Sequence, residues 1–349
     1  MGASIVFMPL YAEDLGASNL MVGLTRSSYG AAFLISAFIF GRLSDLHGRL
    51  IFIRLGLALA AGAYLLQIIA PNPVLLLLIR ALVGFCLGMS ISAIMAYVHE
   101  SGARVGSVAA YGSLGWAVSA VIAGVFEEYS TLFIASAAAV VLALLVSFIL
   151  REEKRVLMEV AVFPLDIIWS NRKIYFPFLL RHMGATAIWA IFPLFLADMG
   201  ASKSWIALLW GINLGGQFVA MLIVQRFSPT RMFTTGLILS IAVFTIYAIA
   251  TDYIQLVPVQ VILAISWSCL YIGALNFLLM KNMERGTALG LLYSANHLGN
   301  SVGPFLGGGV AQLWGFGAVM YCAAGLSAIG LLASRGAVAG VRRRVRRAA

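Results

Sequence analysis

Charged side chains interrupt a few of the long apolar stretches in this sequence, and their types suit solute binding rather than bond-breaking chemistry. Arg80 lies roughly six residues, or about 9 Å of helix, inside one stretch. Arg181 and His182 lie at a similar depth in another. A guanidinium beside an imidazole would suit an anionic or zwitterionic group on a solute. Either arginine could instead extend to the lipid headgroups, and both interpretations stay open.

Two further sets of polar residues share a helix face by their spacing. Asn213 and Gln217 are four residues apart in one stretch. In another stretch the positions i, i+3, i+4 and i+7 are polar: Tyr293, Asn296, His297 and Asn300. Such a face should point toward the protein interior or water rather than lipid. These residues could line a substrate cavity, or they could join helices by hydrogen bonds.

Groups needed for catalysis are missing. No Asp or Glu lies at the centre of an apolar stretch, and no nucleotide-binding loop or nucleophile constellation occurs. Cys86, Cys269 and Cys322 are far apart and lack metal-binding spacing, so we expect three small buried hydrophobic residues. We therefore expect no enzyme, no cofactor and no metal. Proton coupling stays open, since proton-coupled carriers usually hold a carboxylate in mid-membrane.

Composition predicts that the chain lies in a membrane. Of its 349 residues, 62% are hydrophobic and 10% are charged, whereas soluble domains carry roughly 25% charged residues. A soluble fold could not cover this much apolar surface with a water-facing shell. A hydrocarbon core of about 30 Å needs roughly 20 apolar residues per helix. We therefore expect an all-α, polytopic membrane protein.

Apolar stretches predict twelve transmembrane helices, of which the first is short. The short one is 1–12, and the others are 20–40, 50–70, 74–98, 105–126, 130–150, 174–197, 205–225, 232–250, 254–280, 287–312 and 315–334. One long polar connection divides them into two sets of six. The expected domains are an N-terminal half (1–150), a central loop (151–173), a C-terminal half (174–334) and a basic tail (335–349).

The distribution of basic residues predicts the orientation. Alternate loops place 19 Lys and Arg residues on one side and only Arg26 and Lys203 on the other; Arg80 and Arg181, inside predicted helices, complete the total of 23. Since cytoplasmic loops are rich in Lys and Arg, the central loop and the tail should be cytoplasmic. The net charge of +10 therefore indicates contact with anionic lipid rather than nucleic acid.

An internal repeat at an offset of 184 residues supports two related halves. Gly16-Ala17-Ser18 matches Gly200-Ala201-Ser202, and Gly124 matches Gly308. Parallel halves related in this way are a transporter architecture, with the substrate site between them. The seventh predicted helix is longer than the first, so we expect the first helix to be truncated and the natural chain to begin upstream of Met1.

One turn resembles a signature of the major facilitator superfamily. It reads Gly41-Arg42-Leu43-Ser44-Asp45-Leu46-His47-Gly48-Arg49, with Leu46 where the family usually has Arg. The resemblance implies a gating motif made of Gly41, Asp45, Gly48 and Arg49. It also implies that Asp45 docks on the N-terminus of the eleventh helix, near Gly286. The alternative is that Asp45 caps only the helix that follows it.

Two weaker motifs are similar to the same family, and the resemblance covers the whole chain. They are Arg80 with Gly84 and Gly88, and the run that begins Gly303-Pro304. The resemblance implies a monomeric carrier in the plasma membrane that moves a small solute by alternating access. A proton-coupled drug or metabolite exporter is the alternative within transport, and a receptor or sensor without flux is the alternative outside it.

Overall fold

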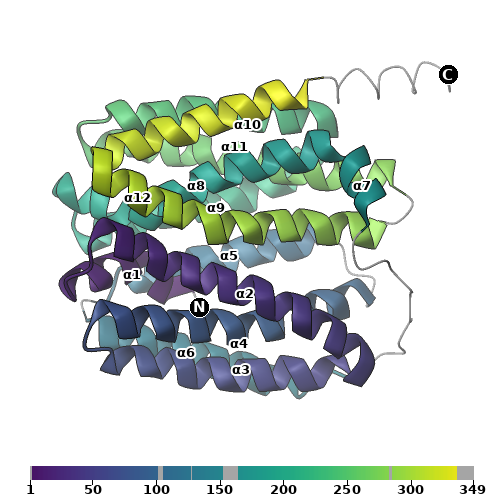
Figure 1. Cartoon of the computed structure of the whole chain (residues 1–349), viewed down its shortest axis with the longest axis horizontal. Helices are drawn as coiled ribbons and strands as arrows, with labels where there is room; N and C mark the ends of the chain where they lie inside the picture. Colours follow the sequence, from purple (N-terminus) through teal and green to yellow (C-terminus); the bar gives the residue numbers. More distant parts are fainter. Residues whose placement is uncertain (1, 101–104, 127, 152–163, 283–284, 336–349) are drawn as a thin grey trace.

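The computed structural model describes residues 2–100, 105–126, 128–151, 164–282 and 285–335. Within these ranges the backbone of Asp45 is described but its side chain is not. The described residues form helices and no strand. The predicted all-α class is therefore confirmed, and Figure 1 shows the helices lying side by side along one common direction.

Helices of the N-terminal half alternate in direction across the fold. Their bounds are α1 Gly2–Asp14, α2 Asn19–His47, α3 Arg49–Leu66, the 3-10 helix η1 Gln67–Ile69, α4 Pro73–Glu100, α5 Val105–Ala123 and α6 Tyr129–Ser147. A short helix, α7 (Leu165–Ser170), lies in the predicted central loop. The sequence analysis expected no helix there.

The second half follows the same plan. Its bounds are α8 Arg172–Asp198, α9 Lys203–Val224, α10 Pro229–Ile249, the 3-10 helix η2 Tyr253–Gln255, α11 Leu256–Lys281 and α12 Arg285–Ser334. The last is two helices that meet at Gly315, whose φ of 79° breaks the helical path. Counted so, the described residues hold the six helices predicted for each half, apart from α7.

Length and composition fit a bilayer. Nine helices within the described ranges are long and apolar enough to cross a membrane, which requires about 20 predominantly apolar residues. The outward faces are apolar as well: Phe38, Leu142 and Ile149 are all more than 60% exposed. Such side chains face lipid in a membrane protein, where apolar exposure is favourable.

Loops joining the first two helices of each half confirm the internal repeat. Gly16 and Gly200 have φ values of 88° and 83°, which favour glycine. Ser18 and Ser202 then accept a hydrogen bond from the backbone N–H three residues later, 3.4 Å in each case. Equivalent sequence thus gives the same turn twice, at an offset of 184 residues.

Contacts between the halves also occur in related pairs. A Cβ atom at Gly308 on α12 would lie 2.9 Å from the Cα of Gly23 on α2, and one at Gly124, directly after α5, would lie 2.6 Å from the Cβ of Ala207 on α9. The repeat relates Gly124 to Gly308 and Gly23 to Ala207. Small residues therefore permit close packing of α2 with α12 and of α5 with α9 (Figure 1).

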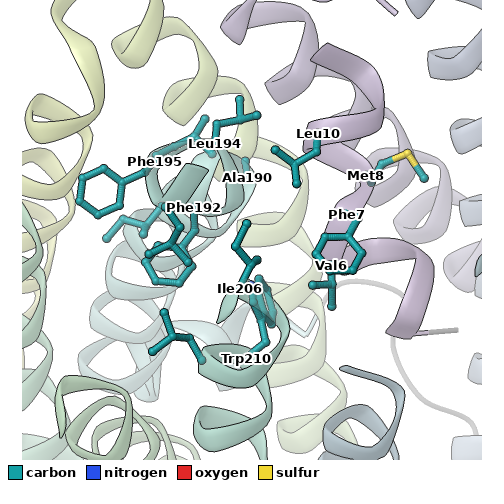
Figure 2. Packing of buried hydrophobic residues seen from close by; sticks show 14 of the residues in the cluster. Val6, Phe7, Met8, Leu10, Ala190, Phe192, Leu194, Phe195, Ile206 and Trp210 are labelled. Atoms are coloured by element: carbon teal, nitrogen blue, oxygen red, sulfur yellow. The ribbon is translucent and has the colours of Figure 1, made fainter. Parts of the chain in front are cut away.

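The largest buried cluster joins the two halves through the first helix of each. Val6, Phe7 and Leu10 of α1 lie opposite α8 and α9 (Figure 2). On those helices Leu194, Ile206 and Trp210 belong to the same cluster. This packing holds the two halves together beside the polar residues described next.

Candidate functional site

Arg181 on α8 is wholly buried between three helices. Its Nε donates to the Ser240 hydroxyl of α10 at 2.8 Å, and its guanidinium carbon lies 5.3 Å from the rings of Phe244 and Trp267. Both terminal nitrogens are buried and have no hydrogen-bond partner among the described residues. The side chain therefore points into the protein rather than to the lipid headgroups.

His182 extends this cluster toward α12. Its ring stacks on Trp267 of α11 at 5.2 Å and meets Trp189 edge-on at 6.2 Å. Asn300 of α12 lies beside it. Gly299 is needed for this approach, because a Cβ atom there would lie 2.7 Å from the imidazole Cδ2. Arg181 and His182 thus share one aromatic environment, centred on Trp267.

Two more arginines lie in the N-terminal half. Arg80 on α4 is buried, donates to Gln67 Oε1 at 3.3 Å, and lies 4.7 Å from the ring of Tyr29. Arg26 on α2 donates to the carbonyl of Trp189 on α8 at 3.2 Å, which joins the two halves. Both arginines line a void of about 10 Å³ between α1, α2 and α4.

The position of Arg26 corrects the sequence analysis, which placed it in an outer loop. Because Ser18 caps α2, the helix begins at Asn19, and Arg26 lies about 10 Å along it. A charged residue seven positions inside an apolar helix was the available signal. Sequence reasoning also missed Ser240, which gave no signal because serine is common in transmembrane helices.

Electrostatically, the interior is positive. Within the described part of the chain, Arg26 interacts with Arg80 and Tyr29, and Arg80 also interacts with Tyr64. Arg181 interacts with Tyr247. No carboxylate is among them. A buried charge without a counterion is costly, so arginines retained at this depth are candidates for a functional role.

The two predicted polar faces have different surroundings. Asn213 and Gln217 on α9 are buried, and Gln217 donates to Asn213 Oδ1 at 2.8 Å. Asn213 donates in turn to the Gln260 carbonyl of α11 at 3.2 Å. Both side chains are therefore used in contacts within the C-terminal half.

The α12 face is directed at the N-terminal half instead. His297 stacks on Phe33 of α2 at 4.3 Å, and the Tyr293 hydroxyl lies 3.9 Å from the sulfur of Met95 on α4. Asn300 donates to Asn296 Oδ1 at 3.2 Å. These half-buried side chains lie where α2 and α4 meet α12, next to the His182 cluster.

At the other end of α2 lies the turn that resembles the gating motif. Gly48 has a φ of 108° and its N–H donates to the Ser44 carbonyl. Arg49 donates to the Ser44 hydroxyl at 3.0 Å, and Gly41 lies on α2 facing Ser92 of α4. The side chain of Asp45 and residues 283–284 lie outside the described part, so the docking of Asp45 stays a prediction.

Cysteines and possible metal ligands form no site in the described ranges. Those ranges hold no group of three or more His, Cys, Asp or Glu side chains that could bind a metal ion. Cys86 and Cys269 are buried as expected, but Cys322 is exposed. That expectation was wrong for Cys322, because a helix in lipid can place an apolar side chain on its outer face.

Comparisons with known proteins agree with this architecture. A family model described as Major Facilitator Superfamily matches residues 1–212 and 174–347. Multidrug resistance protein MdtG of Proteus mirabilis is 26% identical, with 94% of this chain and 89% of that protein covered. Quinolone resistance protein NorA of Staphylococcus aureus is 23% identical, with 95% of this chain and 91% of that protein covered. A crystal structure of a mutant nucleoside transporter NupG shares the fold, with a TM-score of 0.76, 14% identity and coverage of 95% and 97%.

Proposed function

The chain belongs to the major facilitator superfamily and is a secondary transporter of a small solute in the cell membrane, and from that premise we propose that its solute is an amphipathic organic anion. The observation that carries the proposal is the buried guanidinium of Arg181, whose two terminal nitrogens have no partner in the described part of the chain. A planar guanidinium matches a carboxylate or phosphate with two parallel hydrogen bonds.

The neighbours of Arg181 indicate what the rest of the solute should be. Phe244 and Trp267 lie beside the guanidinium, and Trp189 and His182 extend the aromatic surface toward α2. Aromatic walls with a few polar groups are typical of sites for small organic ligands. The charged group would bind Arg181, and an apolar or aromatic body would contact the rings.

Alternating access gives Arg26 a role in this proposal. Its guanidinium bonds to the Trp189 carbonyl across the two halves. Rocking of the halves would break that bond and release a second cation toward the solute. Arg26 and Arg181 would then bind the anionic group in successive states of the cycle. Each guanidinium would thus have an anionic partner in at least one state.

Uptake into proteoliposomes tests the proposal with three matched compounds: an aromatic carboxylate, the amide of the same acid, and an aromatic amine of the same size. We expect the carboxylate to be transported and to raise the unfolding temperature. Arg181→Met should abolish both effects while leaving the unfolding temperature without solute unchanged or higher, because it removes a partly unsatisfied buried charge. Arg231→Met, at an exposed position, is the control. Equal transport of the amine, with no effect of Arg181→Met, would contradict the proposal.

A second candidate is drug export by proton antiport. The relatives MdtG and NorA are named as multidrug and quinolone resistance proteins, which favours a drug as the solute. Uptake measured with and without an imposed pH gradient distinguishes the two.

For the orientation, we propose a cytoplasmic central loop and C-terminus. With Arg26 placed inside α2, Lys203 alone remains of the two basic residues assigned to the outer loops. We also propose that the carrier acts as a monomer.

A further inference from the structure

An apolar groove lies on the outside of the C-terminal half, apart from the candidate substrate site. Its volume is about 720 Å³, within the usual range for small-molecule sites. Its lining lies on α7, α8 and α12, together with Leu34 of α2. Its lining residues include Trp169, Arg172, Lys173, Phe176, Ala295 and Leu298.

The groove wall is apolar and faces the bilayer. Phe176 is 50% exposed and Leu298 is 40% exposed, and both lie within the membrane-spanning part of their helices. The one hydroxyl on the α12 side, that of Ser294, donates to the Gly290 carbonyl of its own helix. An occupant of this wall therefore needs no polar group there.

The mouth of the groove is basic. Arg172 and Lys173 occupy the first turn of α8, which holds no acidic residue. Arg172 donates to the Trp169 carbonyl at 2.8 Å and lies 4.5 Å from the indole ring, so its guanidinium is held at the mouth. A guanidinium has five N–H donors, and this bond uses one.

The start of α8 adds to this positive potential. The Asn171 side chain does not cap the helix. It donates instead to the Ile167 carbonyl at 2.9 Å and to Asn282 Oδ1 at 2.8 Å. The partial positive charge of an uncapped helix N-terminus attracts anions. The helix end and the two cations thus act in the same direction.

We propose that this groove binds an anionic phospholipid, with one acyl chain along the apolar wall and the phosphate between Arg172 and Lys173. The dimensions agree. From Arg172 to Leu179 the wall extends about 10 Å along α8, and half of a hydrocarbon core is about 15 Å. Basic clusters beside transmembrane helices attract anionic lipid, and the predicted cytoplasmic side is the one on which basic residues gather.

A lipid explains these features better than the transported solute does. The groove has exposed apolar side chains such as Phe176 and Leu298 in its lining, whereas Arg181 and His182 are buried among α8, α10, α11 and α12. Lipid is also present at high concentration at this surface. The proposal is thus independent of the solute's identity, and its test needs no transport measurement.

Trp169 reports on the groove directly, because bromine atoms on an acyl chain quench indole fluorescence on contact. We would compare brominated phosphatidylglycerol with brominated phosphatidylcholine at equal mole fraction in bilayers. The Trp169 signal is the difference between the protein and its Trp169→Phe variant. We expect stronger quenching by phosphatidylglycerol, with an apparent preference on the order of tenfold.

In the double variant Arg172→Gln/Lys173→Gln, the two brominated lipids should quench Trp169 fluorescence equally. Arg226→Gln/Arg231→Gln removes two exposed cations, one after α9 and one in the first turn of α10, and should keep the preference. Ala295→Phe fills the groove without changing its charge and should weaken quenching of Trp169 by phosphatidylglycerol. Equal quenching by both lipids in the unmodified protein, or a preference that survives loss of Arg172 and Lys173, would overturn the proposal.

Discussion

The imidazole of His297 on α12 stacks on the ring of Phe33 on α2, with centroids 4.3 Å apart and planes 21° apart. This contact joins the two halves of the carrier. Toward the N-terminal end of α2, which is the predicted outer end, the helices come closer still. A Cβ atom at Gly30 would lie 2.5 Å from the Asn300 carbonyl oxygen, and Ser27 donates to the Ser301 carbonyl. These parts of α2 and α12 are therefore packed backbone against backbone.

We predict that the Phe33–His297 pair contributes about 0.5–1.5 kcal/mol beyond the burial of each ring. A double-mutant cycle of Phe33→Ala and His297→Ala, measured by unfolding in one detergent, should show coupling of that size. His297→Phe keeps a stacked ring and should retain most of the stability. Additive effects of the two alanine substitutions would show that the rings do not interact.

The close approach of α2 and α12 at Gly308 predicts that this residue is needed to close the predicted outer side of the carrier. We predict that Gly308→Leu separates the outer ends of α2 and α12, because the new side chain would meet the Gly23 backbone at 2.9 Å. Ser27→Cys, in a background without the native cysteines, reports this by its labelling rate with a membrane-impermeant maleimide. We expect labelling to be several-fold faster with Gly308→Leu.

Gly309→Leu is the matched control for that measurement. Its Cβ atom would lie 4.0 Å from the end of the Leu20 side chain, which is an ordinary contact. Labelling of Ser27→Cys should be unchanged by Gly309→Leu. If the two leucine substitutions alter the labelling rate equally, close packing at Gly308 is not what closes the outer side.

At the predicted outer surface Tyr129 of α6 has two different partners. Its hydroxyl donates to Asp14 Oδ2 of α1 at 2.7 Å, and Lys203 of α9 lies 4.3 Å above its ring. Tyr129→Phe removes the hydrogen bond, worth about 1 kcal/mol. Tyr129→Leu should also remove the cation–π contact, worth about 0.5–1 kcal/mol at an exposed site.

A cycle with Lys203→Met separates these two contributions in thermal unfolding. The coupling free energy between Lys203 and residue 129 should persist when residue 129 is Phe. It should be lost when residue 129 is Leu. Equal coupling in both backgrounds would mean that the ring does not bind the ammonium group.

The helices were predictable from sequence because their signals are local. Apolar length placed the spans, and the turn chemistry of Gly16 and Ser18 recurs at Gly200 and Ser202. The site was less predictable, because it depends on contacts between distant helices. Nothing near Arg26 in the sequence indicates that its partner is the Trp189 carbonyl, and nothing near Asn213 indicates a bond to the Gln260 carbonyl.

The groove was not predictable for a related reason. In the sequence, Arg172 and Lys173 served only as evidence for a cytoplasmic loop, because residues 151–173 were expected to form a loop. The short helix α7 in that segment, which forms one side of the groove, was not predicted. Which apolar side chains gather beside them follows from the packing of α8 against α12, and no periodicity within either helix specifies that. Only the charge at the mouth was visible in sequence.

The last prediction concerns the turn after α2. The helix ends at His47, Gly48 reverses the chain, and Arg49 bonds to Ser44, so the backbone at Asp45 is held in place. The family resemblance implies that the Asp45 carboxylate docks on the N-terminus of α12, which begins at Arg285. A negative charge at a helix N-terminus contributes about 0.3–1 kcal/mol.

Asp45→Asn keeps the size of the side chain and removes its charge. We expect near-normal expression and transport slowed roughly two- to fivefold, as loss of that stabilisation from one state of the cycle would give. Asp166→Asn removes an exposed acid on α7 and should leave the rate unchanged. Initial rates of solute uptake into proteoliposomes at equal protein density measure both. If Asp45→Asn transports at the unmodified rate, its carboxylate has no gating role, and capping of the following helix would be its only remaining function.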